Sequence, residues 1–367
     1  MKKTIVVALA AILVPSAAMA DVTVKLPAGK ADTTFTIKSM LISDMVLPRS
    51  ERPKNMKEEI RSEGGVLRFA VNDKAPATYG LIYDDESNKV VEFYTSPGDN
   101  LVIDIVKDEP FEYTVSGSPL MDGITALSDQ SRKIMEKYRA AVQAESRDEV
   151  AIEAILKEYQ DLFINFVAAN PSNPTALYAI LNLEGENFMD ALAKVGDGLN
   201  NTPLYPLVVS RKGYVEKSIA ADKRIEELQS GNYDAPAFTL KNLEGKDVSV
   251  SDFKGKWLII DFWGSWCGWC IKGFPKLKDA YEQYQPELEI LGVDCNEPEA
   301  NWRKGVEKYK LPWVNVYNPE GTTILENYGV TGFPTKVIVN PEGKIANITV
   351  GEDPEFFDKL AKLINGK

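Results

Sequence analysis

The sequence predicts a multidomain α+β protein, with an N-terminal antiparallel β domain, a central helical segment and a C-terminal α/β domain. Its 367 residues are enough for two or three domains of ordinary size. Apolar residues occur first in short β-like runs, then at helical spacing, and then in strand and helix patterns that alternate. We therefore divide the chain into residues 1–20, 21–118, 119–231 and 232–367.

The composition restricts the classes of function. Hydrophobic residues make up 44% and charged residues 26% of the chain, as in an ordinary globular protein. The net charge is −12 and no basic stripe is present, so nucleic acid is not an expected partner. Histidine is absent, which excludes Cys–His and Ser–His–Asp catalysis and zinc sites built on histidine.

Residues 1–20 have the three parts of a secretory signal peptide. Lys2 and Lys3 form a positive start, residues 4–14 are apolar, and Ala18-Met19-Ala20 is a small-residue cleavage site. The apolar run is too short to span a bilayer comfortably, and no cysteine lies near the cut to carry a lipid. We therefore expect a soluble periplasmic protein that is not a lipoprotein and begins near Asp21.

Residues 21–118 are predicted to form strands. Short runs rich in β-branched and aromatic residues are separated by turn signals such as Gly64-Gly65 and Pro97-Gly98. The runs are 22–26, 34–40, 66–71, 79–83, 90–94, 101–106 and 111–115. Their spacing predicts a small antiparallel sandwich or barrel.

Residues 119–231 are predicted to be helical, with four or five helices. Apolar residues recur at helical spacing in 124–142, 152–167 and 207–228. We interpret the aromatic stripe of Tyr159, Phe163 and Phe166 as core packing. A dimerising face is the alternative interpretation of this stripe, so a homodimer stays open.

From residue 232 onward, strand and helix patterns alternate. The run from Trp257 to Trp263 is apolar except for Asp261, which is typical of a central strand covered on both faces. A helix is predicted from Gly268 to Tyr284. Further strands are expected at 237–240, 248–250, 288–293, 313–317, 335–339 and 345–350, and further helices at 299–309 and 355–364.

Cys267 and Cys270 form a Cys-x-x-Cys pair between this central strand and this helix. Such a pair is a redox dithiol, half of a zinc site or a haem attachment. The chain lacks the further ligands that zinc needs, and Ile271 stands where haem attachment requires histidine. N–H groups and the dipole at a helix start lower the pKa of a thiol, so we expect Cys267 to be the exposed attacking thiolate and Cys270 the resolving thiol. No metal or other cofactor is expected besides this redox-active disulfide.

Several ordered motifs around the pair carry a family resemblance. They are Ala235-Pro236-Ala237-Phe238-Thr239-Leu240, Phe253-Lys254-Gly255-Lys256, the run from Asp261 to Cys270, Phe274-Pro275 and Gly332-Phe333-Pro334-Thr335. The region from about residue 232 to the end resembles the thioredoxin superfamily, and most closely the TlpA/ResA-like periplasmic thiol–disulfide oxidoreductases. The resemblance implies a thioredoxin fold for residues 232–367. Residues 21–118 are similar to a β domain that precedes such modules in Bacteroidetes proteins.

The resemblance also implies roles for residues near the cysteines. Pro334 is expected to be a cis-proline that faces the pair, which leaves the backbone of Phe333 free to bind an extended substrate strand. Asp261 matches the buried acid of thioredoxin. Burial should raise the pKa of this carboxyl, which makes it the expected acceptor of the Cys270 proton.

Two positions depart from the family pattern. ResA-like proteins usually have glutamate three residues after the second cysteine, where this chain has Gly273. The lysine that neighbours the buried acid in thioredoxin corresponds to Ile290 here. We therefore expect Asp261 to lack a basic neighbour and to be the only strong proton acceptor.

The resemblance implies a protein-disulfide reductase. Its expected partners are disulfide-containing periplasmic proteins and a membrane thiol-electron donor that recycles it. Trp266, Trp269 and Phe333 are expected to form an apolar docking surface for the protein substrate. The residues between the cysteines, Gly268-Trp269, carry no cation, and an ordinary thiolate makes the dithiol the better reductant.

Other interpretations stay open. The protein is alternatively a disulfide isomerase or oxidase, or a non-catalytic binding protein whose cysteine pair is structural. A peroxidase is a further alternative, although Gly264 stands where a Thr-x-x-Cys motif requires threonine. Cys295 is either a small buried apolar residue or a third, regulatory redox thiol.

Overall fold

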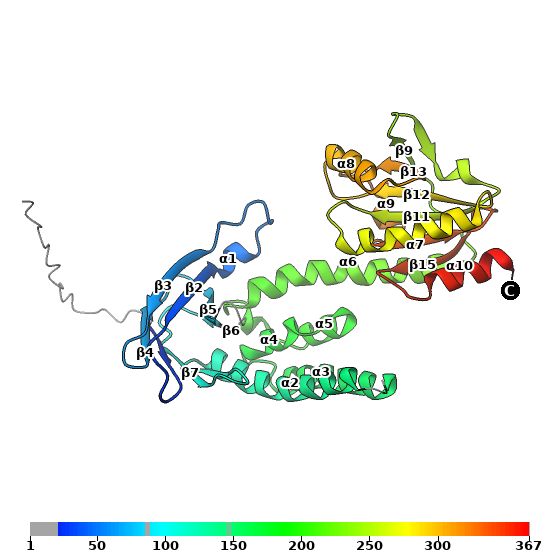
Figure 1. Cartoon of the computed structure of the whole chain (residues 1–367). Helices are drawn as coiled ribbons and strands as arrows, with labels where there is room; N and C mark the ends of the chain where they lie inside the picture. Colours follow the sequence, from blue (N-terminus) through cyan, green and yellow to red (C-terminus); the bar gives the residue numbers. More distant parts are fainter. Residues whose placement is uncertain (1–20, 85–88, 145, 147, 367) are drawn as a thin grey trace, which may run out of the picture. The chain divides into compact units, whose positions relative to one another are not determined.

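The computed structural model describes residues 21–84, 89–144, 146 and 148–366 (Figure 1). Two compact units, Met1–Val215 and Glu216–Lys367, divide the chain. This division falls within helix α6 (Tyr205–Ser230), so the four-part division drawn from the sequence stays a prediction. The predicted signal peptide, residues 1–20, lies outside the described residues.

The first unit begins with two four-stranded sheets. One has the order β4 (Val66–Ala70), β1 (Asp21–Lys25), β7 (Leu101–Lys107) and β8 (Glu112–Ser116). The other has the order β3 (Met56–Arg61), β2 (Thr34–Leu41), β5 (Ala77–Asp84) and β6 (Lys89–Thr95). The ring of Phe69 in β4 lies 6.5 Å from the rings of Tyr79 and Phe93 in the other sheet. These aromatic contacts join the two sheets, and the predicted β-rich N-terminal region is confirmed.

Two features of these sheets differ from the sequence prediction. β1 pairs with β7 in parallel, because the whole second sheet is built between them and gives the chain room to return. β3 was not predicted, because its sequence MKEEIR shows no apolar alternation and nearly all of it is exposed. A charged strand is typical of a sheet edge, where it discourages pairing with another chain.

Helices make up the rest of the first unit. They are α1 (Ile42–Met45), α2 (Pro119–Gln143), α3 (Glu149–Ala169), α4 (Thr175–Leu181), α5 (Gly185–Leu192), the 3-10 turn η1 (Asp197–Leu199) and the first part of α6. Side chains cap the long helices α2 and α3: Ser118 accepts from the Met121 N–H, and Asp148 accepts from the N–H groups of Val150 and Ala151. The prediction of four or five helices between residues 119 and 231 is confirmed for the described residues.

The second unit contains a seven-stranded sheet of order β10-β9-β13-β12-β11-β14-β15. The strands are β9 (Thr239–Asn242), β10 (Asp247–Ser249), β11 (Trp257–Trp263), β12 (Leu288–Asp294), β13 (Val314–Tyr317), β14 (Thr335–Val339) and β15 (Ile345–Val350). β11 is parallel to β12 and antiparallel to β14. The helical elements are η2 (Val250–Phe253), α7 (Gly268–Tyr284), α8 (Glu299–Tyr309), α9 (Ile324–Asn327) and α10 (Phe356–Asn365).

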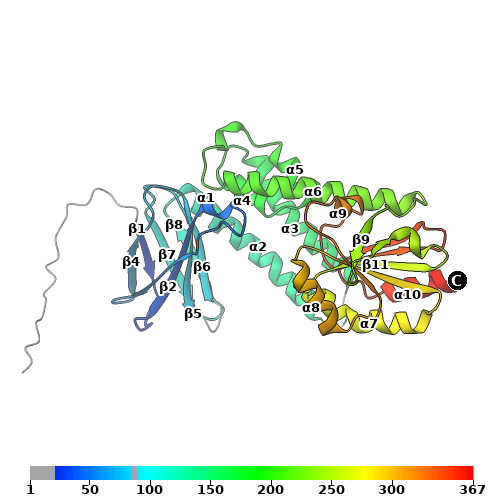
Figure 2. The same ribbon diagram turned by 90° about the horizontal axis from the view of Figure 1, so that it is seen from above.

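Helices cover both faces of this sheet. Side chains of Ile259 and Trp263 in β11 pack with α7, α8 and α10, whereas Ile260 and Phe262 face the last turns of α6 and α9. Figure 2 shows α7 and α10 on one side of the sheet and α9 on the other. The residues from Leu258 to Trp263 are all buried, as a strand covered on both faces requires. The predicted α/β character and thioredoxin fold of this region are confirmed.

Candidate functional site

The cysteine pair lies where the central strand β11 gives way to α7. β11 ends at Trp263, and after a short turn Cys267 is the N-cap residue of α7. Cys270 follows in the first turn of the helix, and the two residues form a disulfide with their Cα atoms 5.3 Å apart. The strand and the helix thus hold both sulfur atoms at one edge of the sheet.

A helix N–H group is directed at the first cysteine. The backbone N–H of Cys270 lies 3.1 Å from the Sγ of Cys267 and donates to it. N–H groups in the first turn have no partner within the helix, and together with the helix dipole they favour a negative charge. The Cys267 Sγ is thus the sulfur atom of the pair that accepts a helix N–H group.

Both cysteines are buried in this disulfide form. Cys267 is 5% exposed and Cys270 is 2% exposed. The prediction that Cys267 is an exposed residue is therefore wrong. The physical reason is packing, since both belong to the core cluster of Trp263 and Phe274, and the ring of Phe333 packs against that cluster.

Two of the three aromatic residues expected at the docking surface come together. The rings of Trp266 and Phe333 are in edge contact, 5.3 Å apart, and Trp266 is 52% exposed. The Nε1 of Trp266 donates to the carbonyl of Cys295 at 3.0 Å, and a Cβ on Gly264 would collide with this indole. Trp269 is exposed but lies under the Nζ of Lys272, 4.4 Å from its ring centre.

The bond between Phe333 and Pro334 is cis, as predicted. The Pro334 carbonyl accepts a hydrogen bond of 2.7 Å from the N–H of Gly351, which ties this loop to the end of β15. Among the described residues, none forms a hydrogen bond with the main-chain N–H or C=O of Phe333. These two groups therefore remain available to an extended peptide.

Asp261 lies in the middle of β11 and is 1% exposed. Its side chain is on the same face as Ile259 and Trp263, which pack in the cluster that contains both cysteines. Burial raises the pKa of Asp261 to about 6, so the predicted direction of the shift is confirmed. One of its oxygens, Oδ1, has no hydrogen-bond partner among the residues that the structure describes.

The expectation that Asp261 lacks a basic neighbour is wrong. Lys336 stands directly opposite Asp261 in the antiparallel pair of β11 and β14 and is itself only 4% exposed. Its charge lowers the pKa of Asp261 and partly opposes the effect of burial. The comparison with thioredoxin pointed to Ile290 on β12, whereas this chain supplies the cation from the strand on the other side of β11.

A second carboxylate also lies near α7. The Nζ of Lys336 is 3.5 Å from the Oε1 of Glu352, which follows β15. A Cβ on Gly273 of α7 would lie 3.0 Å from the same oxygen. The structure therefore places a carboxylate beside the helix position where glutamate is absent, and Asp261 is not the only acid near the cysteines.

Comparisons with known proteins agree with this geometry. A family model described as the AhpC/TSA family matches residues 232–348. The thiol-disulfide oxidoreductase ResA of a Bacillus cereus strain is 35% identical over 133 residues, which are 36% of this chain and 75% of that protein. ResA of Bacillus subtilis (strain 168) is 30% identical over 152 residues, which are 41% of this chain and 83% of that protein.

The chain belongs to the ResA-like thiol-disulfide oxidoreductases. It is accordingly an enzyme of thiol–disulfide exchange. It is also similar to the crystal structure of the thioredoxin domain of a thiol-disulfide oxidoreductase from Bacteroides vulgatus. That similarity has 34% identity and a TM-score of 0.33, and covers 37% of this chain and 95% of that one.

Two further acidic residues, in the turn region beside the cysteines, were missed by the sequence analysis. Asp294, the last residue of β12, is fully buried, and burial together with the nearby Glu297 carboxylate raises its pKa to about 9. Glu297 accepts hydrogen bonds from both the N–H and the Oγ of Ser265, in the turn before Cys267. A signal was present, because β12 is parallel to β11 and residues after its end must lie beside the cysteine turn.

The third cysteine of the oxidoreductase lies on the other face of the sheet. Cys295 is fully buried in the cluster of Phe262 and Val293, and its Sγ donates to the carbonyl of Val293 at 3.4 Å. Burial raises the pKa of its thiol well above the usual range. These observations favour the interpretation of Cys295 as a small buried residue.

The described part of the oxidoreductase shows no group of three or more Cys, Asp or Glu side chains placed to hold a metal ion. Its cysteine pair is present as the expected disulfide. None of the described helices combines the length and the apolar character that crossing a membrane demands.

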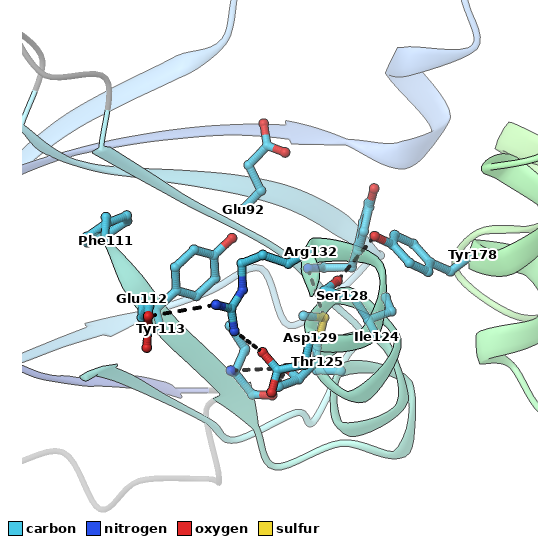
Figure 3. A pocket seen from close by; sticks show the side chains of 13 residues that line it. Glu92, Phe111, Glu112, Tyr113, Ile124, Thr125, Ser128, Asp129, Arg132 and Tyr178 are labelled. Carbon is cyan, nitrogen blue, oxygen red and sulfur yellow. Dashed lines mark hydrogen bonds and ion pairs between the residues drawn. The ribbon is translucent and has the colours of Figure 1, made fainter. Parts of the chain in front are cut away.

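A hollow of about 290 Å³ lies in the first unit between β6, β8, α2 and α4 (Figure 3). Three of its charged groups pair with one another: Arg132 lies 2.6 Å from Asp129 and 3.8 Å from Glu112. The hydroxyl groups of Ser128 and Tyr178 are 3.3 Å apart. None of the predicted site residues lies there.

Proposed function

We propose that this oxidoreductase reduces disulfides of periplasmic proteins through Cys267 and Cys270. The observation that carries the proposal is the 3.1 Å hydrogen bond from the Cys270 N–H to the Cys267 Sγ at the start of α7. It makes Cys267 the more acidic thiol and hence the attacking one. Both cysteines are buried in the disulfide form, so this hydrogen bond is what distinguishes them.

The reduction proceeds in two exchanges. In the first, the Cys267 thiolate attacks one sulfur of the substrate disulfide, so that a mixed disulfide forms and one substrate thiolate leaves. In the second, Cys270 gives its proton to Asp261 and its thiolate attacks the Cys267 Sγ. The Cys267–Cys270 disulfide forms, the second substrate thiolate leaves, and the two electrons of the pair have passed to the substrate.

The substrate chain binds beside the disulfide. An extended segment pairs with the free N–H and C=O groups of Phe333, next to Pro334. The exposed rings of Trp266 and Trp269 provide apolar contact on either side of Cys267. Because these contacts use main-chain atoms and apolar surface, they suit many protein substrates rather than one sequence.

The direction of electron flow follows from the residues between the cysteines. Gly268 and Trp269 supply no positive charge to stabilise the reduced pair. Lys272, in the first part of α7, is directed at the Trp269 ring. The disulfide is therefore the more stable state and the dithiol a reductant, which a membrane thiol-electron donor must regenerate.

The compartment is proposed from residues 1–20. Their positive start, apolar middle and small-residue cleavage site fit export to the periplasm as a soluble protein without a lipid anchor. That compartment is oxidising, so a reductase there needs electrons from outside it. A homodimer would leave this chemistry unchanged, because each chain carries both cysteines.

Insulin reduction with dithiothreitol tests the proposal. We expect the full chain to accelerate insulin precipitation and Cys267→Ser to abolish the acceleration. Cys295→Ser is the matched control and should retain the activity, because this thiol lies on the other face of the sheet. Cys270→Ser should accumulate a mixed disulfide with periplasmic proteins, since the second exchange is blocked.

Three results would overturn the proposal. One is a Cys267→Ser variant as active as the unmodified protein, and another is a disulfide inert to mild reductant, as in a structural cystine. The third is a reduction potential near that of strong oxidants, about −120 mV, combined with oxidation or refolding of scrambled ribonuclease. That last result would assign the protein as an oxidase or isomerase.

A further inference from the structure

Three charged side chains, from β11, β14 and the loop after β15, lie on the α7 face of the sheet. Asp261 on β11 and Lys336 on β14 stand opposite each other, and they are 1% and 4% exposed. Glu352 follows β15, and its Oε1 lies 3.5 Å from the Nζ of Lys336. Its side chain is 37% exposed, so it is the member of this charged triad that contacts solvent.

The triad lies against the helix that carries the cysteines. Gly273 is three residues after Cys270, about one helical turn, and a Cβ there would come within 3.0 Å of the Glu352 Oε1. The absence of a side chain at Gly273 lets the Glu352 carboxylate approach α7.

The position of Glu352 is fixed by the loop that forms the substrate site. The N–H of Gly351 donates to the carbonyl of Pro334 at 2.7 Å. Gly351 has a φ of +80°, a conformation that favours glycine. The triad is therefore connected through the backbone to the loop that contacts the substrate.

A buried lysine needs an opposite charge nearby. Lys336 forms an ion pair with Glu352 and acts through its charge on Asp261. Its charge favours the ionised form of Asp261, whereas the charge of Glu352 opposes it. On β12 the residue opposite Asp261 is Gly292, which carries no titratable group. The charged groups that act on Asp261 are Lys336 and Glu352. The Cys295 thiol is a further neighbour, and the charge of Asp261 raises its pKa.

We propose that Lys336 and Glu352 are positioning residues that set the pH at which Asp261 becomes ionised. This inference rests on the proposed function, in which ionised Asp261 accepts the Cys270 proton. The positive charge of Lys336 stabilises the ionised carboxylate of Asp261 in the core. The Glu352 carboxylate attracts the Lys336 ammonium group toward solvent and so weakens that stabilisation. The balance between these two contacts determines the acid limit of disulfide reduction.

A carboxyl titration tests the inference directly. The full oxidised chain, labelled with ¹³C at aspartate carboxyl groups, is titrated by NMR, and Asp261→Asn identifies the resonance. Lys336→Met should raise the titration midpoint of Asp261 by about one pH unit or more, because an opposite charge nearby typically lowers a carboxyl pKa by about 1 to 3. Glu352→Gln should lower the midpoint.

Two further variants keep the test decisive if Lys336→Met does not fold. Gly273→Ala displaces the Glu352 carboxylate and should lower the midpoint as Glu352→Gln does. Glu355→Gln, another acidic residue a few positions along the chain, is the matched control and should leave the midpoint unchanged. A midpoint that stays the same in Glu352→Gln and Gly273→Ala overturns the inference.

The pH profile of insulin reduction gives the functional result. Its acid limb should move to lower pH in Glu352→Gln and to higher pH in Lys336→Met. Loss of insulin reduction in the unmodified protein would refute the proposed function, while the carboxyl titration would still decide the roles of Lys336 and Glu352. The Asp261 midpoint could shift in these variants while the acid limb of insulin reduction stays in place. That result would show that Asp261 does not accept the Cys270 proton, and it would overturn the inference.

Discussion

At the scale of single residues, Asp261 makes stability depend on pH. Burial raises its pKa from 3.8 to about 6, so below about pH 4 the carboxyl is protonated in both folded and unfolded chains. As the pH rises through 6, the folded protein must ionise a buried group that the unfolded chain ionises more easily. The contribution of Asp261 to the free energy of unfolding is therefore largest at low pH and is lost as the pH rises from about 4 to about 6.

Asp261→Asn should remove this pH-dependent fall in the free energy of unfolding. Relative to the unmodified protein, the free energy of unfolding of the variant should increase between pH 4 and pH 7, by on the order of 2 to 3 kcal/mol. Urea unfolding of the oxidised protein at several pH values measures the difference. A difference that does not change with pH would contradict the raised pKa.

Trp266 gives a second prediction for a single residue. Its ring is 52% exposed beside Phe333, so Trp266→Ala removes apolar contact with a protein substrate but no reacting group. The KM for insulin should rise by about 3- to 10-fold, which corresponds to a loss of about 1 kcal/mol. Reduction of a small aromatic disulfide should be nearly unchanged.

The control for Trp266→Ala is Tyr214→Ala, a second exposed aromatic residue that lies in the first unit. It should change neither reaction. An equal effect of both substitutions on the KM for insulin would show that the contact is not specific to the cysteine site.

The sequence was sufficient to predict Cys267, Cys270 and the buried position of Asp261, because local patterns carry those features. It was not sufficient for Lys336 and Glu352. Lys336 becomes the neighbour of Asp261 only through the register of two strands that are far apart in the chain. Non-local pairing of this kind leaves no mark in the spacing of residues along the sequence.

At the scale of elements, predictions were best where both faces of an element are buried or one face is strongly apolar. The bounds of β11, α7, α8 and β14 agree with those expected from the sequence. β3 was missed because its exposed, charged sequence resembles a loop. Its strand conformation comes from pairing with β2, which local propensity does not encode.

The start of α3 gives a prediction for an element. The Oδ1 of Asp148 accepts from the N–H groups of Val150 and Ala151, both at 3.1 Å. Asp148→Ala should therefore lower the free energy of unfolding of the first unit by about 1 kcal/mol. Asp148→Asn, which keeps a capping oxygen, is the matched control and should be close to neutral in urea unfolding followed by circular dichroism. Equal losses in both variants would show that the negative charge, and not the cap, is important.

At the scale of the whole molecule, the two units have separate cores and different chromophores. All six tryptophans of the chain, at positions 257, 263, 266, 269, 302 and 313, belong to the second unit. Tryptophan fluorescence therefore reports on the thioredoxin-fold unit alone. Far-UV circular dichroism reports on both units, since helices and strands occur in each.

This difference makes independent unfolding of the units measurable. Leu177→Ala should leave a cavity in the core of the first unit and lower the free energy of unfolding of that unit by about 2 to 5 kcal/mol. We expect an earlier transition in circular dichroism and an unchanged transition in tryptophan fluorescence. Leu258→Ala, an equally buried leucine of the second unit, is the matched control and should move the fluorescence transition. Coincident shifts of both signals in both variants would show that the chain unfolds as one cooperative unit, because two-state unfolding requires all probes to agree.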